Sequence, residues 1–275
     1  MSKEITQTVR RVRVPDLRLY KQRGEKIVVL TAYDASMARL LESAGVDILL
    51  VGDSLGMVIM GLETTLPVTI EVMLHHTRAV SRGARRALVV ADMPFLSYQA
   101  SLPQAVRNAG RFLQEGGAAA VKIEGGRPML ETVRRLVDIG IPVMGHLGLT
   151  PQSVHRQGGF RRQAQSDEDA ARLVEDARSL EQAGAFAIVL ESIPPEVAKA
   201  ATAAVSVPTI GIGAGPDCDG QVLVSYDMLG LSGELAPPFV KQYGRLGEQL
   251  VRAAQAFARD VRRGRYPASA KGGRG

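Results

Sequence analysis

The sequence contains no tryptophan and a single cysteine, and aromatic residues make up only 4% of the chain. One cysteine, Cys218, cannot form an internal disulfide or a thiolate metal cluster. So few aromatic side chains disfavour a protein that stacks nucleic-acid bases on aromatic platforms. No stretch approaches the roughly 18 consecutive apolar residues that a membrane span requires. These absences exclude disulfide scaffolds, cysteine-based metal proteins and membrane-spanning proteins.

The composition of what remains is that of a folded protein. The 275 residues include 45% apolar and 23% charged side chains, enough apolar surface to offset the entropy of ordering the chain. The first segment, MSKEITQTVRRVRVPD, is charged and has no apolar block, so it does not resemble a secretory signal. We therefore expect a soluble, cytoplasmic globular protein.

Basic side chains outnumber acidic ones, and the excess lies at the two ends of the chain. The formal net charge is +6, residues 1–26 and 261–275 each contribute +5, and the body between them carries −4. A nucleic-acid binder clusters positive charge on a folded face with a recognisable motif, which this sequence lacks. We interpret both ends as solvated arms and expect neither a nucleic-acid nor a membrane partner.

Short apolar runs alternate with helical patterns along the chain. The runs predict strands that are buried on both sides, at residues 27–33, 48–52, 87–91, 118–123, 142–146, 187–190, 208–212 and 221–225. The helical patterns, many marked by a proline or polar cap at the start and a glycine at the end, cover residues 35–44, 69–83, 102–115, 128–138, 166–183, 195–203 and 239–262.

Eight strands alternating with helices over about 230 residues predict one α/β domain of the (β/α)8, or TIM barrel, type. An open doubly wound sheet would give the same alternation, but no dinucleotide fingerprint follows the first strand, which favours the closed barrel. We predict a single barrel domain over residues 1–260, including the basic N-terminal segment. Residues 261–275 are expected to form a basic, disordered tail.

Polar residues interrupt the pattern at one kind of position, the carboxyl end of successive strands. In a β/α barrel these ends open on the same face, where such enzymes keep their active sites. Lys122 lies two residues before Glu124, so both side chains point to the same side of their strand, into the mouth of the barrel. The strand-end residues are Asp53, Asp92, Glu124, His146 and Glu191.

Carboxylates that converge in this way need a cation, because like charges a few ångströms apart destabilise the fold. Asp53, Asp92 and Glu124 are oxygen donors without a histidine pair or thiolate to compete, so the expected ion is a hard divalent one, magnesium. Beside it, Lys122 suits a substrate carboxylate or oxyanion.

Each strand-end residue taken alone has a simpler interpretation. Asp53 and Asp92 could each cap the following helix, which is the commoner role of an aspartate after a strand. Glu124 could belong to an ordinary turn, His146 could be a satisfied core histidine, and Glu191 could be an exposed helix start. The structural interpretation would have to hold at all five consecutive strand ends. We therefore interpret the five residues together as a functional site.

Blocks that contain these residues resemble the ketopantoate hydroxymethyltransferase family. They are LTAYDA, VGDSLGMV, ADMPFLSY, VKIEGG, GHLGLTPQSV, LESIP and GIGAGPDCDGQVLVSYDMLGL, in that order, from about Val14 to about Arg252. Two departures stand out. Leu96 occupies a position where the family usually has glycine, and the stretch Phe160–Ala164, FRRQA, replaces the usual Tyr-Lys-Val-Gln-Gly.

The resemblance implies a magnesium-binding β/α barrel that assembles as a homo-oligomer, typically a decamer, in the pantothenate pathway to coenzyme A. It implies transfer of a one-carbon unit from 5,10-methylenetetrahydrofolate to 3-methyl-2-oxobutanoate, giving 2-dehydropantoate. Carried over by motif, the metal ligands are Asp53, Asp92 and Glu124, the oxo acid contacts Asp53, Ser54, Asp92 and Lys122, and Glu191 is the base. We expect His146 to support the enolate or the product hydroxyl.

The proposed chemistry explains these residue types, because the reaction removes a proton beside a ketone through a magnesium-stabilised enolate. The alternative is a magnesium-dependent carbon–carbon lyase or a relative of phosphoenolpyruvate mutase. Such an enzyme would have the same barrel, the same metal and a similar enolate intermediate. Such lyases typically carry a catalytic cysteine in a flexible loop, and Cys218 has no such setting. A non-enzymatic scaffold acting through the basic ends is disfavoured, because it has no need for strand-end carboxylates.

Overall fold

The computed structural model of this chain describes residues 10–233 and 236–267. Parts of the predicted basic N-terminal segment and of the predicted disordered tail, residues 1–9 and 268–275, lie outside the described residues. Contacts divide the chain into two compact units, one ending at Val224 and the other beginning at Ser225. The single barrel domain over residues 1–260 stays a prediction.

The described part of the first unit contains eight parallel strands that pair in chain order and form a closed barrel. Residues Ile27–Leu30 of β1 pair with Gly220–Leu223 of β8, which closes the ring and rules out the open doubly wound sheet. Each strand predicted from the sequence agrees within two residues at both ends. The strands are β1 (Ile27–Thr31), β2 (Ile48–Val51), β3 (Leu88–Asp92), β4 (Ala120–Glu124), β5 (Val143–Gly148), β6 (Ala187–Glu191), β7 (Thr209–Ile212) and β8 (Gly220–Leu223).

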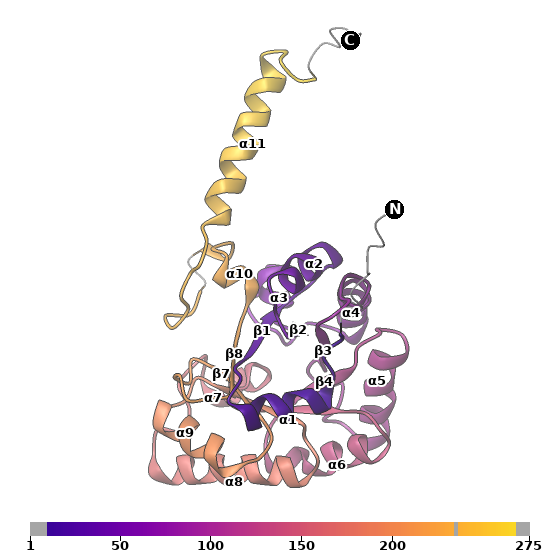
Figure 1. The fold of residues 1–275 in the computed structure, drawn as a ribbon, viewed down its shortest axis with the longest axis vertical. Coiled ribbons are helices and arrows are strands. Elements are labelled where there is room, and N and C mark those ends of the chain that lie inside the picture. Colours follow the sequence, from indigo (N-terminus) through magenta and orange to yellow (C-terminus); the bar gives the residue numbers. More distant parts are fainter. Residues whose placement is uncertain (1–9, 234–235, 268–275) are drawn as a thin grey trace, which may run out of the picture. The chain divides into compact units, whose positions relative to one another are not determined.

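Amphipathic helices cover the outside of the barrel (Figure 1). Side-chain caps begin several of these helices. The Asp34 carboxylate accepts two backbone N–H groups at residue 35, and the Ser101 and Ser166 hydroxyls cap the helices that begin at residues 102 and 167. The covering helices are α2 (Ala35–Ser43), α4 (Ile70–Gly83), α5 (Leu102–Gln114), η1 (Arg127–Met129) with α6 (Leu130–Asp138), α8 (Asp167–Gln182) and α9 (Pro195–Ala204). Shorter segments in the loops are α3 (Leu55–Val58), η2 (Pro151–Ser153) and α7 (Val154–Gln157).

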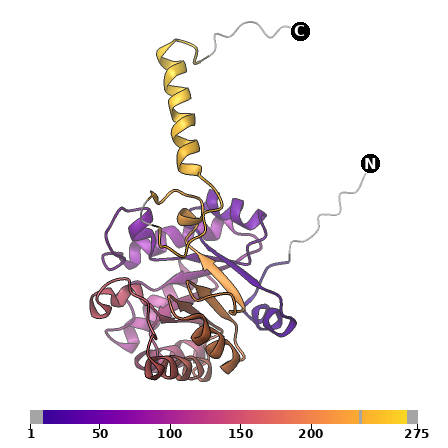
Figure 2. The same ribbon diagram turned by 90° about the vertical axis from the view of Figure 1, so that its left-hand side faces the viewer.

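An unpredicted helix, α1 (Val14–Arg23), lies at one end of the barrel (Figure 2). The Asp16 carboxylate accepts the backbone N–H of Arg13 at its start, and Gly24 ends it with a left-handed φ of 68°. Leu17 is fully buried in the cluster that fills the barrel interior. Because its neighbours there include Ile27 and Ile48, at the starts of β1 and β2, α1 closes the amino-terminal end of the barrel.

The barrel interior below the site is a packed apolar core. Side chains alternate along each strand, so every second residue points inward. The inward set on successive strands includes Val29, Leu50, Val90, Ala120 and Val189, all buried in one cluster. This core leaves the carboxyl ends of the strands as the place where polar groups can face the interior.

Leu96 and Ala164, two of the residues of the first unit with left-handed backbone, lie where the sequence departs from the family that it resembles. Leu96 has a φ of 62° and Ala164 a φ of 52°. A Cβ atom in this region clashes with the neighbouring carbonyl, whereas glycine adopts it freely. The family's usual glycines are therefore explained by backbone geometry, and this chain keeps the loop shape in a strained form.

We expect Leu96→Gly and Ala164→Gly each to raise the free energy of unfolding by about 0.5–1 kcal/mol, because relief of left-handed strain outweighs glycine's extra freedom in the unfolded chain. Leu96 is 55% exposed, so little burial is lost. Urea unfolding measures the effect. Ala171→Gly, within α8, is the matched control and should lose about 1 kcal/mol. An equal loss in the free energy of unfolding for all three variants would show that Leu96 and Ala164 are not strained.

The second unit contains α10 (Ser225–Met228) and α11 (Leu246–Arg262). The sequence predicted a helix that begins at residue 239. This start is wrong, because α11 begins seven residues later, at Leu246. The cause is the preceding segment: Pro237 and Pro238 open it, and the backbone N–H groups of Tyr243 and Leu246 bond to carbonyls of residues 228 and 229 instead of to a helical turn. No helix within the described ranges is long and apolar enough to cross a membrane.

Candidate active site at the carboxyl ends of the strands

The inward-facing positions change from apolar to charged over the last residues of the strands. On β4 the inward set runs Ala120, Lys122, Glu124, and on β3 Asp92 follows Val90. The register pairs Asp92 with Lys122 and Glu124 with His146. Parallel pairing thus places four ionisable side chains in adjacent positions on three neighbouring strands, as the sequence predicted.

Lys122 is the central cation of this cluster. Its Nζ atom lies 2.9 Å from Asp92 Oδ1, 3.2 Å from His146 Nδ1 and 4.0 Å from Glu124 Oε1. The Lys122 side chain is only 5% exposed, so these charges interact with little screening by water. The ammonium group is therefore held by its neighbours in one position inside the barrel mouth.

His146 links this cluster to Glu191 on the other side of the mouth. His146 Nδ1 lies 3.4 Å from Glu124 Oε1, and His146 Nε2 lies 3.1 Å from Glu191 Oε2. Glu191 ends β6, which stands four strands away from β2 in the closed order and so faces Asp53 across the barrel. The next residue, Ser192, has a left-handed φ of 48°, and such strained backbone concentrates at functional sites.

Asp53 is held by a glutamine that the sequence analysis did not select. Gln152 Nε2 donates to Asp53 Oδ2 at 2.9 Å, and the backbone N–H of Gln152 donates to Glu124 Oε2 at 3.0 Å. The Tyr98 hydroxyl donates to Gln152 Oε1 at 2.8 Å, and the backbone N–H of Asp53 donates to Asp92 Oδ2 at 3.1 Å. The side-chain amide and the backbone N–H of one buried glutamine thus orient two of the three predicted metal ligands.

Ser54 lies at the edge of this cluster. Its hydroxyl is 3.0 Å from the Tyr33 hydroxyl. A Cβ atom on Gly52 would come within 2.7 Å of the Ser54 hydroxyl and 3.5 Å of Asp92 Oδ2, so the glycine leaves room for both. The structure therefore brings all seven predicted site residues, Asp53, Ser54, Asp92, Lys122, Glu124, His146 and Glu191, to one end of the barrel.

The pKa values reflect this crowding of buried charges. Burial, and after it the carboxylates of Asp92 and Glu124, raise the pKa of Asp53 to about 8. Burial opposes a charged His146, but the Glu124 and Glu191 carboxylates raise its pKa to about 9. Burial also opposes the Lys122 charge, yet Asp92, Glu124 and Asp53 raise the pKa of this lysine. The cluster therefore holds more negative charge than Lys122 alone balances.

The simpler interpretations of these residues do not hold. Asp53 and Asp92 cap no helix: Ser54 precedes α3, Ser101 caps α5, and both aspartates are 3% exposed. Glu124 is buried rather than in a surface turn. His146 is buried but contacts two carboxylates, and the Glu191 side chain is 17% exposed at the mouth.

The donor set fits a hard divalent cation. Asp53, Asp92 and Glu124 present only oxygen atoms, and the buried Asp92 Oδ1 has no hydrogen-bond partner, only the Lys122 charge. As the side chains stand, no three His, Cys, Asp or Glu residues of the described ranges form a ready-made metal cluster. In this arrangement Gln152 donates hydrogen bonds to Asp53 and Glu124, and Lys122 Nζ lies 2.9 Å from Asp92 Oδ1 and 4.0 Å from Glu124 Oε1.

Comparison with known proteins identifies the family. The model of the ketopantoate hydroxymethyltransferase family matches residues 11–269. The chain belongs to this family. The 3-methyl-2-oxobutanoate hydroxymethyltransferase of Syntrophus aciditrophicus (strain SB) is 56% identical over 258 residues, covering 94% of this chain and 95% of the relative. As a ketopantoate hydroxymethyltransferase family member, the chain is a transferase, and the resemblance seen in the sequence is confirmed.

Solved structures similar to this ketopantoate hydroxymethyltransferase family member share its barrel at low identity. A 2,3-dimethylmalate lyase of the PEP mutase/isocitrate lyase superfamily has a TM-score of 0.58 at 19% identity, over 94% of this chain and 90% of that one. Phosphonopyruvate hydrolase, in complex with oxalate and Mg²⁺, has a TM-score of 0.61 at 16% identity, over 94% and 91%. These likenesses confirm the predicted barrel fold.

Proposed function

We propose that this chain transfers a one-carbon unit from 5,10-methylenetetrahydrofolate to 3-methyl-2-oxobutanoate, giving 2-dehydropantoate and tetrahydrofolate. The supporting observation is the division of charge across the barrel mouth. Asp53, Asp92 and Glu124 gather with Lys122 on one side, and Glu191 stands on the opposite strand. One side can hold a polarised oxo acid while the other receives its proton.

Asp53, Asp92 and Glu124 would hold the magnesium ion, with Gln152 fixing the orientation of Asp53 and Glu124. When bound, the ion would supply Lewis acidity for an enolate that develops on the 2-oxo acid. Lys122 would balance the substrate carboxylate, and the Ser54 hydroxyl would orient it. Lys122 forms a 2.9 Å ion pair with Asp92. The Ser54 hydroxyl and the Asp92 carboxylate both border the space that a Cβ atom on Gly52 would fill.

Glu191 would remove the proton from the third carbon of the oxo acid. The carbon so deprotonated would form a bond to the methylene carbon of the folate. Both bonds from that methylene carbon to the folate nitrogens would break, one water molecule would supply the hydroxyl oxygen overall, and the two nitrogens would regain one proton from water and one from the oxo acid. His146, 3.1 Å from the Glu191 carboxylate, would position that carboxylate and support the enolate or the product hydroxyl. A base at this place contributes about 10²- to 10⁴-fold to the rate of such reactions.

The direct test is a coupled assay for folate-dependent formation of 2-dehydropantoate, run with and without EDTA. The proposal requires product only when both the folate and a divalent cation are present. Full turnover after rigorous chelation would contradict the metal assignment, and absence of folate-dependent product would contradict the function itself.

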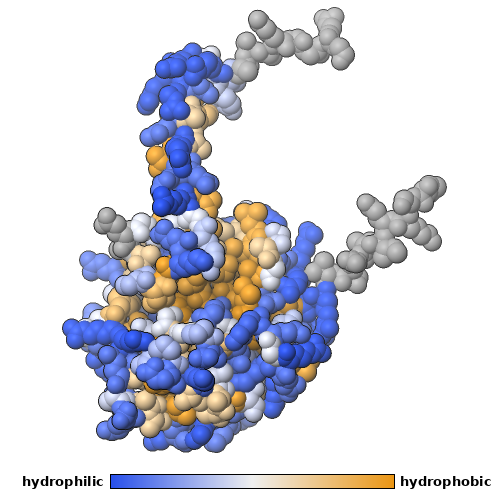
Figure 3. Space-filling model, turned by 60° about the vertical axis from the view of Figure 1, so that its left-hand side comes forward, coloured by the Kyte–Doolittle hydropathy of each residue, from blue (hydrophilic) through white to orange (hydrophobic). Residues whose placement is uncertain are grey.

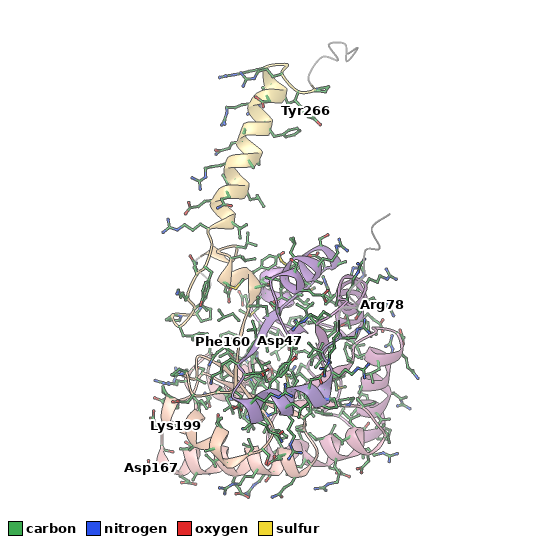
Figure 4. All side chains as sticks on the ribbon, viewed as in Figure 1. Asp47, Arg78, Phe160, Asp167, Lys199 and Tyr266 are labelled. Carbon is green, nitrogen blue, oxygen red and sulfur yellow. The ribbon has the colours of Figure 1, made fainter. Side chains whose placement is uncertain are left out.

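Asp92→Asn tests the ligand set by a binding measurement that needs no turnover. We expect magnesium affinity to fall by at least about tenfold, because an amide oxygen carries no charge to offset the dehydration of a hard cation. Titration calorimetry measures this, with Asp167→Asn, on the exposed start of α8 (Figure 4), as the control. Unchanged affinity in Asp92→Asn would show that the ligand set is wrong.

A homo-oligomer, a decamer by resemblance, fits the surface of α11. Along this helix the apolar residues Leu246, Leu250, Phe257 and Val261 share one face, and none is buried. Figure 3 shows apolar surface exposed along the helix, and the Phe257 ring packs edge-on against the Tyr266 ring, with centroids 5.2 Å apart. An exposed apolar face of this length favours self-association. The cytoplasmic location and the absence of nucleic-acid or membrane partners stay predictions.

A magnesium-dependent carbon–carbon lyase or phosphoenolpyruvate mutase-like enzyme is the second candidate, supported by the shared barrel fold. The cysteine that such lyases typically use has no counterpart here: Cys218 is fully buried, and burial raises the pKa of its thiol. Incubation with isocitrate-like acids in the absence of folate separates the two candidates, because cleavage there would favour the lyase.

A further inference from the structure

Two hydroxyl groups lie together at the edge of the charged cluster, and the reaction proposed above uses only one of them. The Tyr33 hydroxyl is 3.0 Å from the Ser54 hydroxyl, within the range of an O–H···O hydrogen bond. Tyr33 comes two residues after β1 and Ser54 three residues after β2, so the contact joins the ends of two paired strands. Tyr33 is only 2% exposed, so its phenol is held inside the protein.

Ser54 does not use its hydroxyl to cap the helix that it precedes. It occupies the N-cap position of α3, but its side chain makes no cap hydrogen bond. Space lies beside it, because a Cβ atom on Gly52 would come within 2.7 Å of the Ser54 hydroxyl oxygen and 3.5 Å of Asp92 Oδ2. The Ser54 hydroxyl is therefore available to a ligand that binds at the charged cluster.

The backbone of Tyr33 is held by a histidine from outside the cluster. His76, a half-buried residue of α4, places its Nδ1 atom 2.6 Å from the Tyr33 carbonyl oxygen. A carbonyl oxygen can only accept a hydrogen bond, so Nδ1 is the donor in this contact. Tyr33 is thus held at its carbonyl by His76 and at its hydroxyl by Ser54.

The charge of the substrate decides which of the two hydroxyls donates to the other. A serine hydroxyl has one proton to donate and lone pairs that accept. If Ser54 donates its proton to the carboxylate of the oxo acid, its oxygen can accept from the Tyr33 hydroxyl, 3.0 Å away. Hydrogen bonds in a chain polarise one another, so a serine that accepts from Tyr33 is a stronger donor to an anion.

We propose that Tyr33 is a positioning residue for the oxo acid and acts through Ser54. Its hydroxyl donates to Ser54 Oγ and so directs the Ser54 proton at the substrate carboxylate, while every proton stays on its own oxygen. Tyr33 itself contacts neither the oxo acid nor the metal ion. The inference rests on the proposed function, because it places a 2-oxo acid beside Ser54 and Lys122.

A double-mutant cycle of Tyr33→Phe and Ser54→Ala tests this role, with Tyr243→Phe as the matched control because Tyr243 is 68% exposed. Calorimetry measures the Kd of 3-methyl-2-oxobutanoate with magnesium present and folate absent. We expect this Kd to rise about 2- to 10-fold in Tyr33→Phe and about 10- to 100-fold in Ser54→Ala, which loses a hydrogen bond to a charged group. The double variant should match Ser54→Ala to within about twofold.

Two further measurements on Tyr33→Phe separate positioning from a general loss of structure. Magnesium affinity without the oxo acid should equal that of the wild-type chain. Exchange of the proton on the third carbon with deuterated water should need more oxo acid for half-saturation, while its maximal rate stays within about twofold of wild type. Equal losses of magnesium and oxo-acid affinity would overturn the proposal, because Tyr33 would then support the whole site.

Two results of the cycle would also overturn the proposal. Additive losses in the double variant would mean that Tyr33 acts independently of Ser54, and an unchanged Kd in either single variant would remove the hydroxyl pair from substrate binding. The cycle contains no folate, so it is separate from the transfer reaction. A wild-type chain that binds the oxo acid but forms no folate-dependent product would overturn the proposed function and leave the role of Tyr33 in place.

Discussion

Glu191→Gln is expected to stop exchange of the proton on the third carbon of 3-methyl-2-oxobutanoate while leaving magnesium and oxo-acid binding intact. The carboxylate ends β6, faces Asp53 across the barrel, and lies 3.1 Å from His146. A glutamine keeps the shape and the hydrogen-bonding capacity but cannot accept the proton. Loss of a general base costs about 10²- to 10⁴-fold, and proton NMR in deuterated water measures it directly.

The matched control is Glu196→Gln, which changes an exposed glutamate in the first turn of α9 and should exchange at the wild-type rate. Magnesium and oxo-acid affinities, measured by calorimetry, show whether the variant site is still assembled. Exchange near the wild-type rate in Glu191→Gln would remove this residue as the base.

Lys122→Met is expected to lower the free energy of unfolding by about 3–5 kcal/mol in EDTA, because it leaves buried carboxylates without their cation. The ammonium is 2.9 Å from Asp92 and 4.0 Å from Glu124. Methionine preserves most of the side-chain volume, so the loss reports charge rather than a cavity. Magnesium should stabilise this variant more than the wild-type chain, since the carboxylates have lost their internal partner.

Urea unfolding of Lys199→Met supplies the control, because Lys199 is an exposed lysine on α9 (Figure 4). The free energy of unfolding of this variant should differ from wild type by no more than about 0.5 kcal/mol. The double variant Lys122→Met/Asp92→Asn should lose less than the sum of the single changes, as expected for a contacting pair. Equal costs for the two lysine changes would contradict the role of Lys122 as the central cation.

Much of the fold could be predicted because its strands are short apolar runs with sharp polar ends. The period of apolar runs and helical patterns located all eight barrel strands, and closure followed from their number. α1 was missed because its mean hydropathy is low and Leu17 is its one fully buried apolar side chain, with Val14 and Tyr20 only partly buried against the core. The start of α11 was misplaced because apolar residues before it, from Phe239 on, extend the helical pattern back to the two prolines.

The site was predictable where its residues end strands, because parallel pairing carries such residues to one face whatever the loops do. Asp92, Lys122, Glu124 and His146 met for this reason. Gln152 and Tyr98 were missed because they come from loops, whose path the strand pattern does not determine. Both lie inside blocks that carry the family resemblance, GHLGLTPQSV and ADMPFLSY, so that signal was present in the sequence but not tied to a strand end.

The plug formed by α1 has a kinetic consequence. Leu17 and the apolar core next to it fill the amino-terminal part of the barrel, so substrates reach the site from the carboxyl ends of the strands. If the oxo acid sits deep beside Lys122 and the folate nearer the rim, the small acid must enter first. Its enlarged product must then wait for tetrahydrofolate to depart. A ten-residue helix at the far end of the barrel thus imposes an order of arrival and exit on the whole catalytic cycle.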